Sequence, residues 1–423
     1  MSDYMFLLES RLSPDQLQSL VQVQQAAAGA HMPIFLAGGA VRDLLGGFPI
    51  RDLDFSVEGP ALKLVRQLHR GLFTIRSTDE QRQAAELVFG GGATLEIAMC
   101  RRETYPKAGG QPEVGPATIQ DDLRRRDFSV NAIALSLNQA SRGLLLDPTN
   151  GLADMEHKEL RTLSNYAFYD DPSRLLRLIR LQARLKYTVE ERTRNQLENA
   201  REAGVAEQIQ PRSRLRELQQ LADEPEMVEA IKGLESAGLL EVFEPHLGKK
   251  LDLPILAQLE KTRRLVESAG LRVDCFGPFL WALAKKLSTA ERIGLRTRLG
   301  LKAAEAKPWT ELETQARAFQ KTLSGKQMVQ NSRLYEAVTA EDPAVALFLI
   351  AYSRVQEVRQ RLKSYFKELR PAVSNVRDEE IEELGVKRGS PKFEKLREAY
   401  VAARLDKKIN SKEEAAKVLA AYL

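Results

Sequence analysis

The pattern of apolar and polar positions divides the chain into two parts. In the first third, short apolar runs with the character of β-strands alternate with glycine turns and helical stretches, at residues 34–37, 53–57, 84–89 and 93–99. From about residue 170 the apolar positions follow a helical period, and we expect no further strand. The pattern predicts an α+β fold, in which an N-terminal head with a small mixed sheet and helices precedes an all-α remainder.

Turn and cap residues mark some of the predicted boundaries. The sequence Asp170-Asp171-Pro172 predicts a helix start, because acidic residues favour the first turn and proline fits the first helical position. The stretch 106–116, which contains glycine and proline, predicts a mobile loop. The segment 385–391, GVKRGSP, precedes a helical stretch rich in lysine and arginine and predicts a separate basic tail.

The composition indicates a globular chain without a cysteine- or histidine-based metal site. Of the 423 residues, 43% are hydrophobic and 29% charged, which excludes a mainly disordered chain. The apolar runs are shorter than the roughly 18 residues of a membrane span, and the N-terminus lacks a secretion-signal pattern, so we expect a cytoplasmic protein. The two cysteines are predicted to be buried thiols. Because the four histidines are scattered singly, any metal ion should be held by carboxylates.

Positive charge is concentrated outside the N-terminal third. The whole chain has 63 basic and 58 acidic residues, a net charge of +5. Residues 1–140 have 14 basic and 16 acidic residues, so the remainder has 49 and 42, a net charge of +7. This distribution favours a polyanionic partner for the helical part.

The first candidate site combines a glycine turn with two aspartates. Gly38 and Gly39 follow a predicted strand and precede Arg42, an arrangement that brings backbone amides and a guanidinium to a phosphate chain. Asp52 and Asp54 alternate at the start of the next strand, so their side chains project from one face. Two like charges so placed repel unless a cation lies between them, and Mg²⁺ held by carboxylates and substrate phosphates meets that need.

A third carboxylate, Glu96, lies on a later predicted strand, from which it would reach the same site. Taken alone, Glu96 fits an exposed carboxylate at a strand edge better, and the glycine turn alone fits an ordinary turn. The aspartate pair combined with that turn favours a metal-dependent phosphate site.

The stretch DLRRRDFSVNA, residues 122–132, is the second candidate site. Three consecutive arginines cannot share one helix face, so at least one should point inward toward an anion or a carboxylate. Asp127 and Asn131 are four residues apart on a predicted helix and present an acceptor and an amide to one spot, which suits a ribose hydroxyl. A solvated charge run with a helix cap is the alternative interpretation.

A third pair lies at the predicted helix start near residue 170. Asp171 and Arg174 are three residues apart, which places an acceptor beside a donor on the first turn. The more common meaning of this spacing is a capped helix with a local salt bridge.

Four motifs occur in the order GGAVRD with RDLD, DDLRRRDFSVNA, DPTNGLAD and DDPSRLLRLIR. Together they resemble the class II tRNA nucleotidyltransferases, the CCA-adding enzymes and bacterial poly(A) polymerases of the polymerase β superfamily. The resemblance covers about residues 34–221, and the C-terminal tail resembles the bacterial CCA-adding type more loosely. Asp170 departs from the family, which usually has glutamate there.

The resemblance implies a role for each part of the head. Asp52 and Asp54 would hold two Mg²⁺ ions, one activating the 3′ hydroxyl of the tRNA and one bound to the triphosphate, with Glu96 as the auxiliary catalytic carboxylate. The residues that would bind the phosphates and the ribose of the nucleotide are Gly38, Gly39, Arg42, Arg126, Asp127 and Asn131.

Base recognition is implied for Asp171, Arg174 and Arg177, with ATP and CTP as substrates. Cytosine and adenine each present an amino donor beside a ring-nitrogen acceptor, whereas uracil and guanine present a carbonyl beside a ring N–H. A carboxylate next to a guanidinium matches the first pair of bases. Against the second pair it leaves unmatched groups that cost about 1–3 kcal/mol each.

The resemblance further implies four domains. These are a catalytic nucleotidyltransferase head (1–145), a base-recognising neck (146–221), an RNA-binding helical body (222–360) and a helical basic tail that binds tRNA (361–423). A hinge between head and neck would contain Asp147 and Gly151, where an ordinary turn is the alternative.

The implied partner of the helical part is tRNA. Its excess positive charge suits the phosphates and A-form shape of the acceptor stem and TΨC arm, and neither a membrane nor an obligate protein partner is implied. Candidate tRNA contacts, for which a solvated helix face is an equal alternative, are Lys387, Arg388, Lys392, Lys395 and Arg397.

The predicted function is template-independent addition of C and A to the 3′ end of tRNA, from CTP and ATP, with release of pyrophosphate. A poly(A) polymerase would share the head chemistry, but the arginine-rich segment usual in that enzyme is missing at 81–85. The loop at 101–117 argues against a loop-deleted CC-adding enzyme and leaves the A-adding partner of a split system open. A catalytically inactive RNA-binding protein is a remote alternative, because Asp52, Asp54 and Arg126 are all present.

Overall fold

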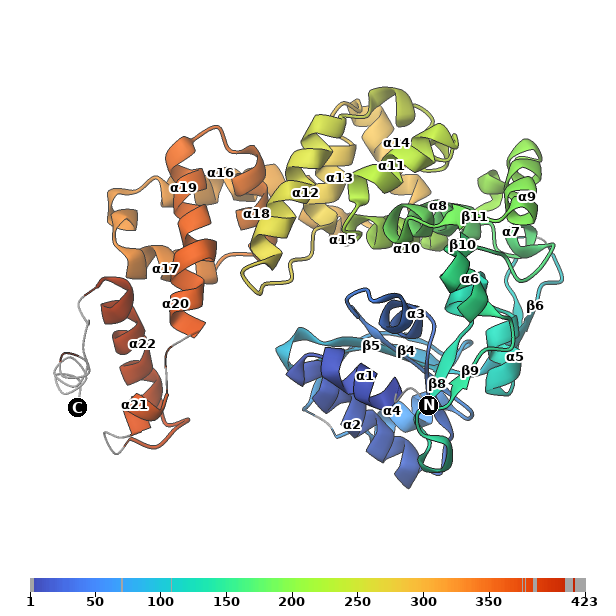
Figure 1. The fold of residues 1–423 in the computed structure, drawn as a ribbon. Helices are drawn as coiled ribbons and strands as arrows, with labels where there is room; N and C mark the ends of the chain where they lie inside the picture. The colour runs from blue at the N-terminus through green and yellow to red at the C-terminus, as the bar shows by residue number, and fades with distance from the viewer. Residues whose placement is uncertain are drawn as a thin grey trace. The chain divides into compact units, whose positions relative to one another are not determined.

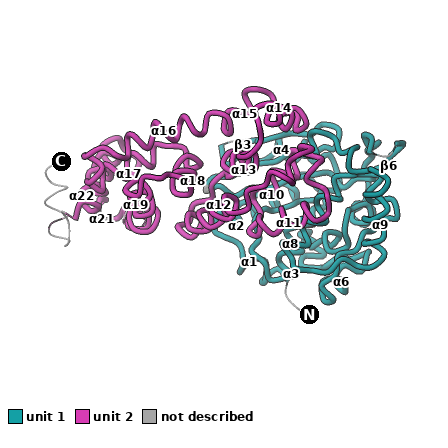
Figure 2. The backbone as a smooth tube through the Cα atoms, turned by 90° about the horizontal axis from the view of Figure 1, so that it is seen from above, with its two compact units in different colours: residues 1–213 teal, residues 214–423 magenta. Residues whose placement is uncertain are grey.

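The chain forms two compact units in a computed structural model that describes residues 4–69, 71–107, 109–374, 376, 378–382, 386–407 and 414 (Figure 1). The units divide between Ser213 and Arg214, inside helix α10 (Pro211–Ala222) (Figure 2). This boundary lies within the predicted neck, so the division into four domains stays a prediction.

Unit 1 is built around a seven-stranded sheet in the order β3-β4-β5-β2-β1-β8-β9. Strands β2 and β5 run parallel, and the other neighbours are antiparallel, so the sheet is mixed as predicted. The strands predicted near 34, 53, 84 and 93 are confirmed. The seven strands are β1 (Ile34–Ala37), β2 (Leu53–Val57), β3 (Phe73–Asp79), β4 (Ala84–Phe89), β5 (Thr94–Met99), β8 (Ala134–Ser136) and β9 (Leu145–Leu146).

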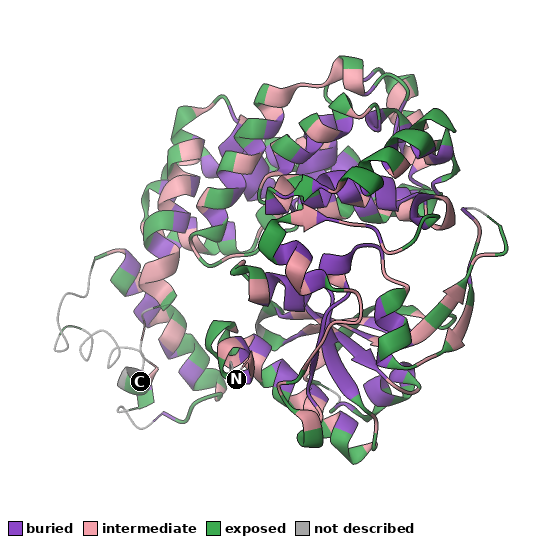
Figure 3. Cartoon of the chain, turned by 45° about the vertical axis from the view of Figure 1, so that its right-hand side comes forward, coloured by how far each residue is buried: buried purple, intermediate pink, exposed green. Residues whose placement is uncertain are grey.

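Helices pack against this sheet. In β2, Leu53, Phe55 and Val57 are buried, whereas Asp54 between them is partly exposed. Figure 3 shows buried residues, in purple, along the strands of this sheet. Helix α4 packs against β4 and β5, and helix α3 packs against β1 and β2. The helices of unit 1 are α1 (Tyr4–Arg11), α2 (Pro14–Gly29), α3 (Gly39–Gly46), α4 (Ala61–Gln67), α5 (Ile119–Arg124), α6 (Gly151–His157), α7 (Ala167–Asp170), α8 (Arg174–Leu185) and α9 (Glu191–Glu202).

Three sequence-based expectations about unit 1 are wrong. The predicted mobile loop is part of a two-stranded ribbon, β6 (Arg101–Thr104) paired with β7 (Glu113–Pro116). A strand does occur after residue 170, because the short β11 (Thr188–Val189) pairs with β10 (Glu159–Leu160). Helix α8 begins at Arg174 rather than near residue 170, since α7 ends at Asp170 and a turn intervenes.

Unit 2 is helical throughout its described residues, as predicted for the second part of the chain. Aromatic contacts among Trp281, Phe348 and Tyr352 join helices α13 and α18, and a π-helical turn at Tyr365–Leu369 connects α19 to α20. Its further helices are α11 (Met227–Ser236), α12 (Leu253–Glu267), α13 (Phe276–Leu283), α14 (Thr289–Arg298), α15 (Ala303–Thr310), α16 (Leu312–Leu323), α17 (Asn331–Thr339), α18 (Pro343–Tyr352), α19 (Gln356–Ser364), α20 (Arg370–Ser374), α21 (Glu379–Glu382) and α22 (Pro391–Leu405).

The expected cysteine chemistry agrees with the structure. Cys100 and Cys275 are both buried free thiols. Burial raises the pKa of each thiol, to about 12 for Cys275, so both are inert at neutral pH. In the part of the chain that the structure describes, no helix has the length and apolar character needed to span a membrane.

Candidate active site

The glycine turn after β1 brings the predicted phosphate and metal residues together. Gly38 has a φ of +68°, and a β-carbon there would lie 2.6 Å from Nη1 of Arg126. A β-carbon on Gly39 would lie 3.4 Å from Oδ2 of Asp54 and 3.6 Å from Nη2 of Arg42. Glycine is needed at residue 38 for its backbone angle and for the close approach of Arg126, whereas a β-carbon at residue 39 would make only ordinary van der Waals contacts. The structure thus gathers Asp54, Arg42 and Arg126 around this turn.

The three predicted carboxylates gather on the exposed face of the sheet. Asp54 of β2 is in register with Glu96 of β5, and Asp52 immediately precedes β2. The Thr94 hydroxyl donates a hydrogen bond to Asp52. Burial, together with the negative charges of Glu96 and Asp52, raises the pKa of Asp54 to about 7. The repulsion is a property that a bound cation would relieve.

The donor set fits a divalent metal ion. All three side chains offer hard carboxylate oxygens, which Mg²⁺ prefers. A further carboxylate, Glu86 of β4, is in register with Glu96 and therefore shares this face of the sheet. The sequence analysis missed Glu86, although the alternation of β4 offered a signal for it.

Arg126 is the inward-pointing arginine that the triple-arginine run predicts. Its Nη2 donates to Oδ2 of Asp122 and to Oγ of Ser56, both at 3.0 Å. Asp122 also binds Arg125 Nη2 at 2.5 Å. Burial opposes ionisation of Asp122, but Arg126 and Arg125 outweigh it and lower its pKa to about 2. Ser56 and Asp122, which the sequence analysis left without a role, therefore hold Arg126 in place.

Asp127 and Asn131 meet as predicted, but the predicted helix between them is wrong. Helix α5 ends at Arg124, and only Ser129–Asn131 forms a 3₁₀ turn. The chain bends back so that Asn131 Nδ2 donates to Asp127 Oδ1 at 3.0 Å. Burial of Asp127 opposes its ionisation, yet Arg177 and Arg174 hold its pKa far below the ordinary value.

The predicted base-recognition pair lies at the start of α8, which is in unit 1. Nε of Arg174 is 4.0 Å from Oδ2 of Asp171, and Arg174 Nη2 donates to the Arg125 carbonyl at 3.3 Å. Asp171 Oδ1 accepts bonds from the Ser173 backbone at 3.1 Å and hydroxyl at 2.6 Å. Arg177, predicted for the same role, donates to Asp127 at 2.7 Å. Asp171 and Arg174 therefore lie side by side, whereas Arg177 is hydrogen-bonded to Asp127, a predicted ribose-binding residue.

Two arginines of the site have buried donors without a partner. Among the described residues, Nε of Arg126 and Nε of Arg174 are buried and have no hydrogen-bond partner. Unsatisfied buried donors cost about 1–3 kcal/mol each, so their presence beside the glycine turn and beside Asp171 suits a ligand that supplies acceptors.

The predicted hinge residues stabilise the start of α6. Both carboxylate oxygens of Asp147 accept backbone bonds, from Gly151 at 2.8 Å and from Leu152 at 2.9 Å. A β-carbon on Gly151 would lie 2.2 Å from the Ser129 carbonyl oxygen. Glycine is required here for close packing, and the hinge function stays a prediction.

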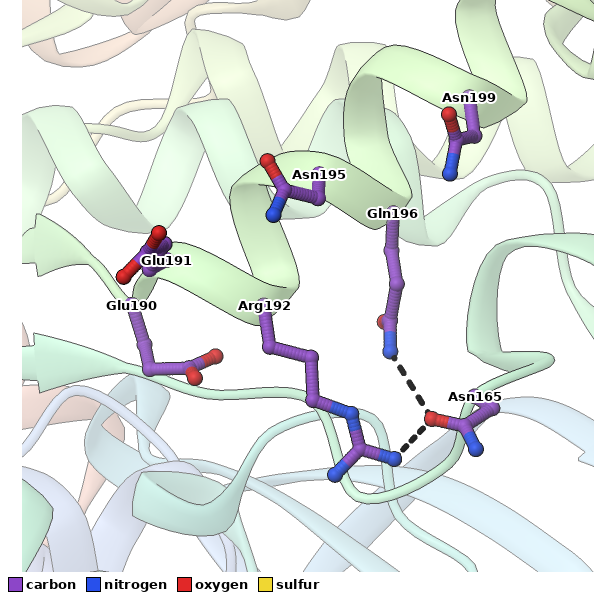
Figure 4. A pocket seen from close by; sticks show the side chains of 7 residues that line it. All are labelled: Asn165, Glu190, Glu191, Arg192, Asn195, Gln196 and Asn199. Carbon is purple, nitrogen blue, oxygen red and sulfur yellow. Dashed lines mark hydrogen bonds between the residues drawn. The ribbon is translucent and has the colours of Figure 1, made fainter.

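A shallow pocket of about 480 Å³ lies along α9, apart from these residues (Figure 4). Arg192 and Gln196 both donate to Oδ1 of Asn165 across it. It is lined by Asn165, Glu190, Glu191, Arg192, Asn195, Gln196 and Asn199, none of which the sequence analysis selected. The predicted nucleotide-binding residues do not line this pocket.

The candidate tRNA contacts lie in the C-terminal part of unit 2. Asp378 binds Nη2 of Arg388 at 2.7 Å and Nε of Arg397 at 3.0 Å. Arg397 is half-buried, and the exposed candidates are Lys387, Arg388, Lys392 and Lys395. A role in tRNA binding stays a prediction for all five, and part of the predicted tail motif, Gly385, lies outside the described residues.

Comparisons with known proteins agree with the geometry. Residues 34–161 match the family model described as the poly(A) polymerase head domain. An A-adding tRNA nucleotidyltransferase from Geobacter sulfurreducens is 28% identical over 89% of this chain and 43% of its own length. One from Halalkalibacterium halodurans is 36% identical over 57% of this chain and 56% of its own length. The chain thus spans about half the length of these curated relatives.

Solved structures extend the similarity over the whole chain. A CCA-adding enzyme in an apo form is 26% identical, with a TM-score of 0.54, and covers 100% of this chain and 99% of its own. A CCA-adding enzyme from Thermotoga maritima, complexed with tRNA, is 26% identical with a TM-score of 0.52 and the same coverage. Residues 34–161 therefore match the poly(A) polymerase head domain, and the chain as a whole has a fold similar to that of CCA-adding enzymes.

Proposed function

We propose that this chain adds C and A nucleotides to the 3′ end of tRNA without a nucleic acid template, using CTP and ATP and releasing pyrophosphate. One observation carries the proposal: Asp54, Arg42 and Arg126 converge on a glycine turn in which a β-carbon at residue 38 would collide with Arg126. The two guanidinium groups gathered at this turn suit the negative charge of a triphosphate. The names of the related proteins, which add CC, A or CCA to tRNA, support the choice of substrate.

The proposed chemistry assigns separate tasks to two groups of side chains. Asp52 and Asp54 would hold two Mg²⁺ ions, which when bound lower the pKa of the attacking hydroxyl and neutralise charge on the triphosphate, with Glu96 as an auxiliary carboxylate. Arg42 and Arg126 orient the triphosphate, and the buried Nε of Arg126 gains an acceptor from it. Asp127 and Asn131 bind the ribose, after which the 3′ hydroxyl of tRNA displaces pyrophosphate.

The proposed base selection depends on Asp171 and Arg174. A carboxylate beside a guanidinium pairs with the amino group and ring nitrogen of cytosine or adenine. The buried, unpartnered Nε of Arg174 supports this role. We expect Asp171→Ala to relax the rejection of UTP and GTP by about tenfold. Asp170→Ala is the matched control, and unchanged rejection of both nucleotides in Asp171→Ala would contradict this role.

The proposed partner is the acceptor stem and TΨC arm of tRNA, bound in the cytoplasm by the basic helical part. Exposed lysines and Arg388 around α22 support a phosphate-driven contact. We expect the affinity for tRNA to fall steeply as salt rises from 50 to 200 mM, by at least about 100-fold if five phosphates are contacted. A flat salt response would argue against this interface.

An A-adding enzyme of a split system is the second candidate function. Relatives from Geobacter sulfurreducens, Halalkalibacterium halodurans and Aquifex aeolicus are all named A-adding, which favours it. The test incubates the purified chain with tRNAs that end before the first C, before the second C and before the terminal A, with CTP or ATP supplied separately. Products with CC and then A support the main proposal. Extension by A of CC ends alone supports the second candidate, and long A tracts would indicate a poly(A) polymerase.

A further inference from the structure

We propose that Asp43 and Arg184 are positioning residues that fix the base-recognition helix α8 against the phosphate-binding Arg42. The inference rests on the proposed function. It concerns a closed ring of charged and amide side chains within unit 1, which we call the α8 ring: Arg42, Asp43, Arg184, Arg177, Asp127 and Asn131. Neither Asp43 nor Arg184 carries a role in the function as proposed above.

One half of the α8 ring surrounds Arg42. Oδ1 of Asp43 accepts from Nε of Arg42 at 3.0 Å and from Nη2 at 2.8 Å. The remaining terminal nitrogen, Nη1, donates to Oδ1 of Asn131 at 2.6 Å. Three of the donors of Arg42 are therefore fixed by two partners, which sets the plane of its guanidinium.

The other half of the α8 ring is formed by α8. Arg177 and Arg184 are seven residues apart, so they lie two turns apart on one face of the helix. Arg177 Nη1 donates to Oδ2 of Asp127 at 2.7 Å, and Arg184 Nη2 donates to Oδ2 of Asp43. Asp127 in turn accepts from Asn131, which closes the ring.

The ring is made of groups that are costly to bury. Asp43 is 3% exposed, Arg42 5% and Asp127 8%. Buried charge pairs bring little net stability compared with apolar packing, and their best-attested use is to specify one arrangement of the elements that they join. The elements joined here are α3, which carries the phosphate candidate, and α8, which carries Arg174.

The geometric consequence concerns a single substrate molecule. A nucleoside triphosphate would touch Arg42 with its phosphates and Arg174 with its base, so α8 has to keep one position relative to α3. A displacement of about 1 Å in such a constellation can cost about 100-fold in rate. Because Arg184 is two turns beyond Arg177 along α8, its pairing with Asp43 resists tilting of the helix about Arg177.

The test measures nucleotide choice in Arg184→Gln, Asp43→Asn and the double variant. We expect each single variant to lower the ratio of kcat/KM for ATP to that for GTP by about tenfold, through misplacement of Arg174. The double variant should be no worse than Asp43→Asn alone, because the contact between Arg184 and Asp43 is already broken in that variant. Arg184→Lys should recover part of the discrimination, since it keeps the charge.

The matched control is Arg161→Gln. Arg161 binds Asp154 at 2.7 Å in the same unit, outside the α8 ring. This variant should lose stability without a change in nucleotide choice. The inference is overturned if Arg184→Gln behaves like Arg161→Gln, or if the effects of Arg184→Gln and Asp43→Asn add in the double variant. Should Arg184→Gln fail to fold, Arg184→Lys is compared with Arg161→Lys.

A second readout separates this inference from the proposed function. Calorimetric titration of the full chain with ATP and Mg²⁺, without tRNA, should show about tenfold weaker binding in Arg184→Gln than in the unaltered chain. Inactivity of the unaltered chain on every tRNA would contradict the proposed function alone. Equal ATP affinity in both proteins would contradict the α8 ring alone.

Discussion

Two sets of carboxylates in unit 1 are held in opposite electrostatic states. On the exposed face of the sheet, burial, Glu96 and Asp52 raise the pKa of Asp54 to about 7. Behind the glycine turn, burial of Asp122 is outweighed by Arg126 and Arg125, and its pKa falls to about 2. The first set repels internally, whereas the second is neutralised by arginines of the same chain.

The difference separates carboxylates that are able to bind a cation from carboxylates that stabilise the fold of unit 1. A carboxylate paired with buried arginine already has its counter-charge, so it contributes to stability and has little capacity left for a cation. A crowded carboxylate costs stability until a cation binds. Arg126 belongs to both sets, because it is bonded to Asp122 and lies beside Asp54 at the glycine turn.

The largest expected effect comes from a substitution in the crowded set, the three carboxylates Asp52, Asp54 and Glu96. Asp54→Asn should lower single-turnover nucleotide addition by about a thousandfold, which corresponds to the roughly 4 kcal/mol of transition-state stabilisation that a metal site supplies. Its thermal midpoint without metal should stay equal or rise, because the substitution removes a like-charge repulsion. Labelled CTP or ATP in rapid-quench assays gives the rate, and calorimetry gives the midpoint.

Asp15→Asn is the control for this variant, since Asp15 lies in the first turn of α2. Full activity in Asp54→Asn would remove the main support for the proposed chemistry. A large loss of stability in Asp54→Asn would instead show that the sheet-face carboxylates stabilise the fold of unit 1.

The second prediction concerns the neutralised set, in which Asp122 is paired with Arg125 and Arg126. Asp122→Asn removes the buried carboxylate that Arg125 and Arg126 share, while Arg125 keeps Glu103, and should lower the free energy of unfolding at pH 7 by about 3 kcal/mol. Because the pKa of Asp122 is lowered from 3.8 to about 2, its stabilisation is present above pH 4 and disappears as the pH falls toward 2. Urea unfolding at pH 7 and pH 3 should show a smaller difference between variant and unaltered chain at pH 3.

The neighbouring Asp121→Asn supplies the control, because Asp121 is exposed. Its effect should stay within about 0.5 kcal/mol. A constant difference for Asp122→Asn across this pH range would mean that hydrogen bonding, not charge, accounts for its contribution.

The sequence allowed the crowded carboxylates Asp52 and Asp54 to be predicted more fully than the ion pairs of α8, for a physical reason. Asp52 and Asp54 are two residues apart, and the period of a strand alone places them on one face. The ion pairs of α8 depend on tertiary structure: Arg177 is 50 residues from Asp127, and Arg184 is 141 residues from Asp43. Local periodicity carries no information on such contacts.

The errors in the fold prediction have a similar origin. The spacing of Asp127 and Asn131 suggested a helix, yet the chain turns there because Ser129 and Leu163 take part in backbone bonds with Arg161 and Asp127. The stretch 106–116 includes β7, which pairs only with β6 in a separate two-stranded ribbon, so its glycine and proline content indicated a loop and the strand was missed. In both places tertiary contacts outweighed local propensity.

The third prediction uses pH to distinguish the two sets. A proton and a metal ion compete for Asp54, whose pKa is about 7, so the affinity for Mg²⁺ should be about tenfold weaker at pH 6 than at pH 8. Titration calorimetry with Mg²⁺ alone measures this, and Asp54→Asn should remove the dependence. Asp122→Asn should retain it. Equal affinities at both pH values in the unaltered chain would contradict the raised pKa of Asp54.

The smallest expected effect concerns the contact that joins the two sets. Ser56 lies on β2 two residues after Asp54 and is 4% exposed, and its Oγ accepts from Nη2 of Arg126 at 3.0 Å. Ser56→Ala should lower the free energy of unfolding by about 1 kcal/mol, the usual worth of one hydrogen bond. It should also slow nucleotide addition about fivefold, because about 1 kcal/mol of the orientation of Arg126 is lost.

Ser136→Ala is the matched control, because Ser136 is equally buried in the same sheet but bonds to Ser141 and Asn138 instead of an arginine. Ser136→Ala should lose at least as much stability as Ser56→Ala, and only Ser56→Ala should slow the reaction. If the two variants react at the same rate, Asp122 and the Asn131 carbonyl orient Arg126 without Ser56. If Ser56→Ala is slower although its loss of stability is no larger than that of Ser136→Ala, the orientation of Arg126 by Ser56 contributes to the reaction itself and not only to the stability of unit 1.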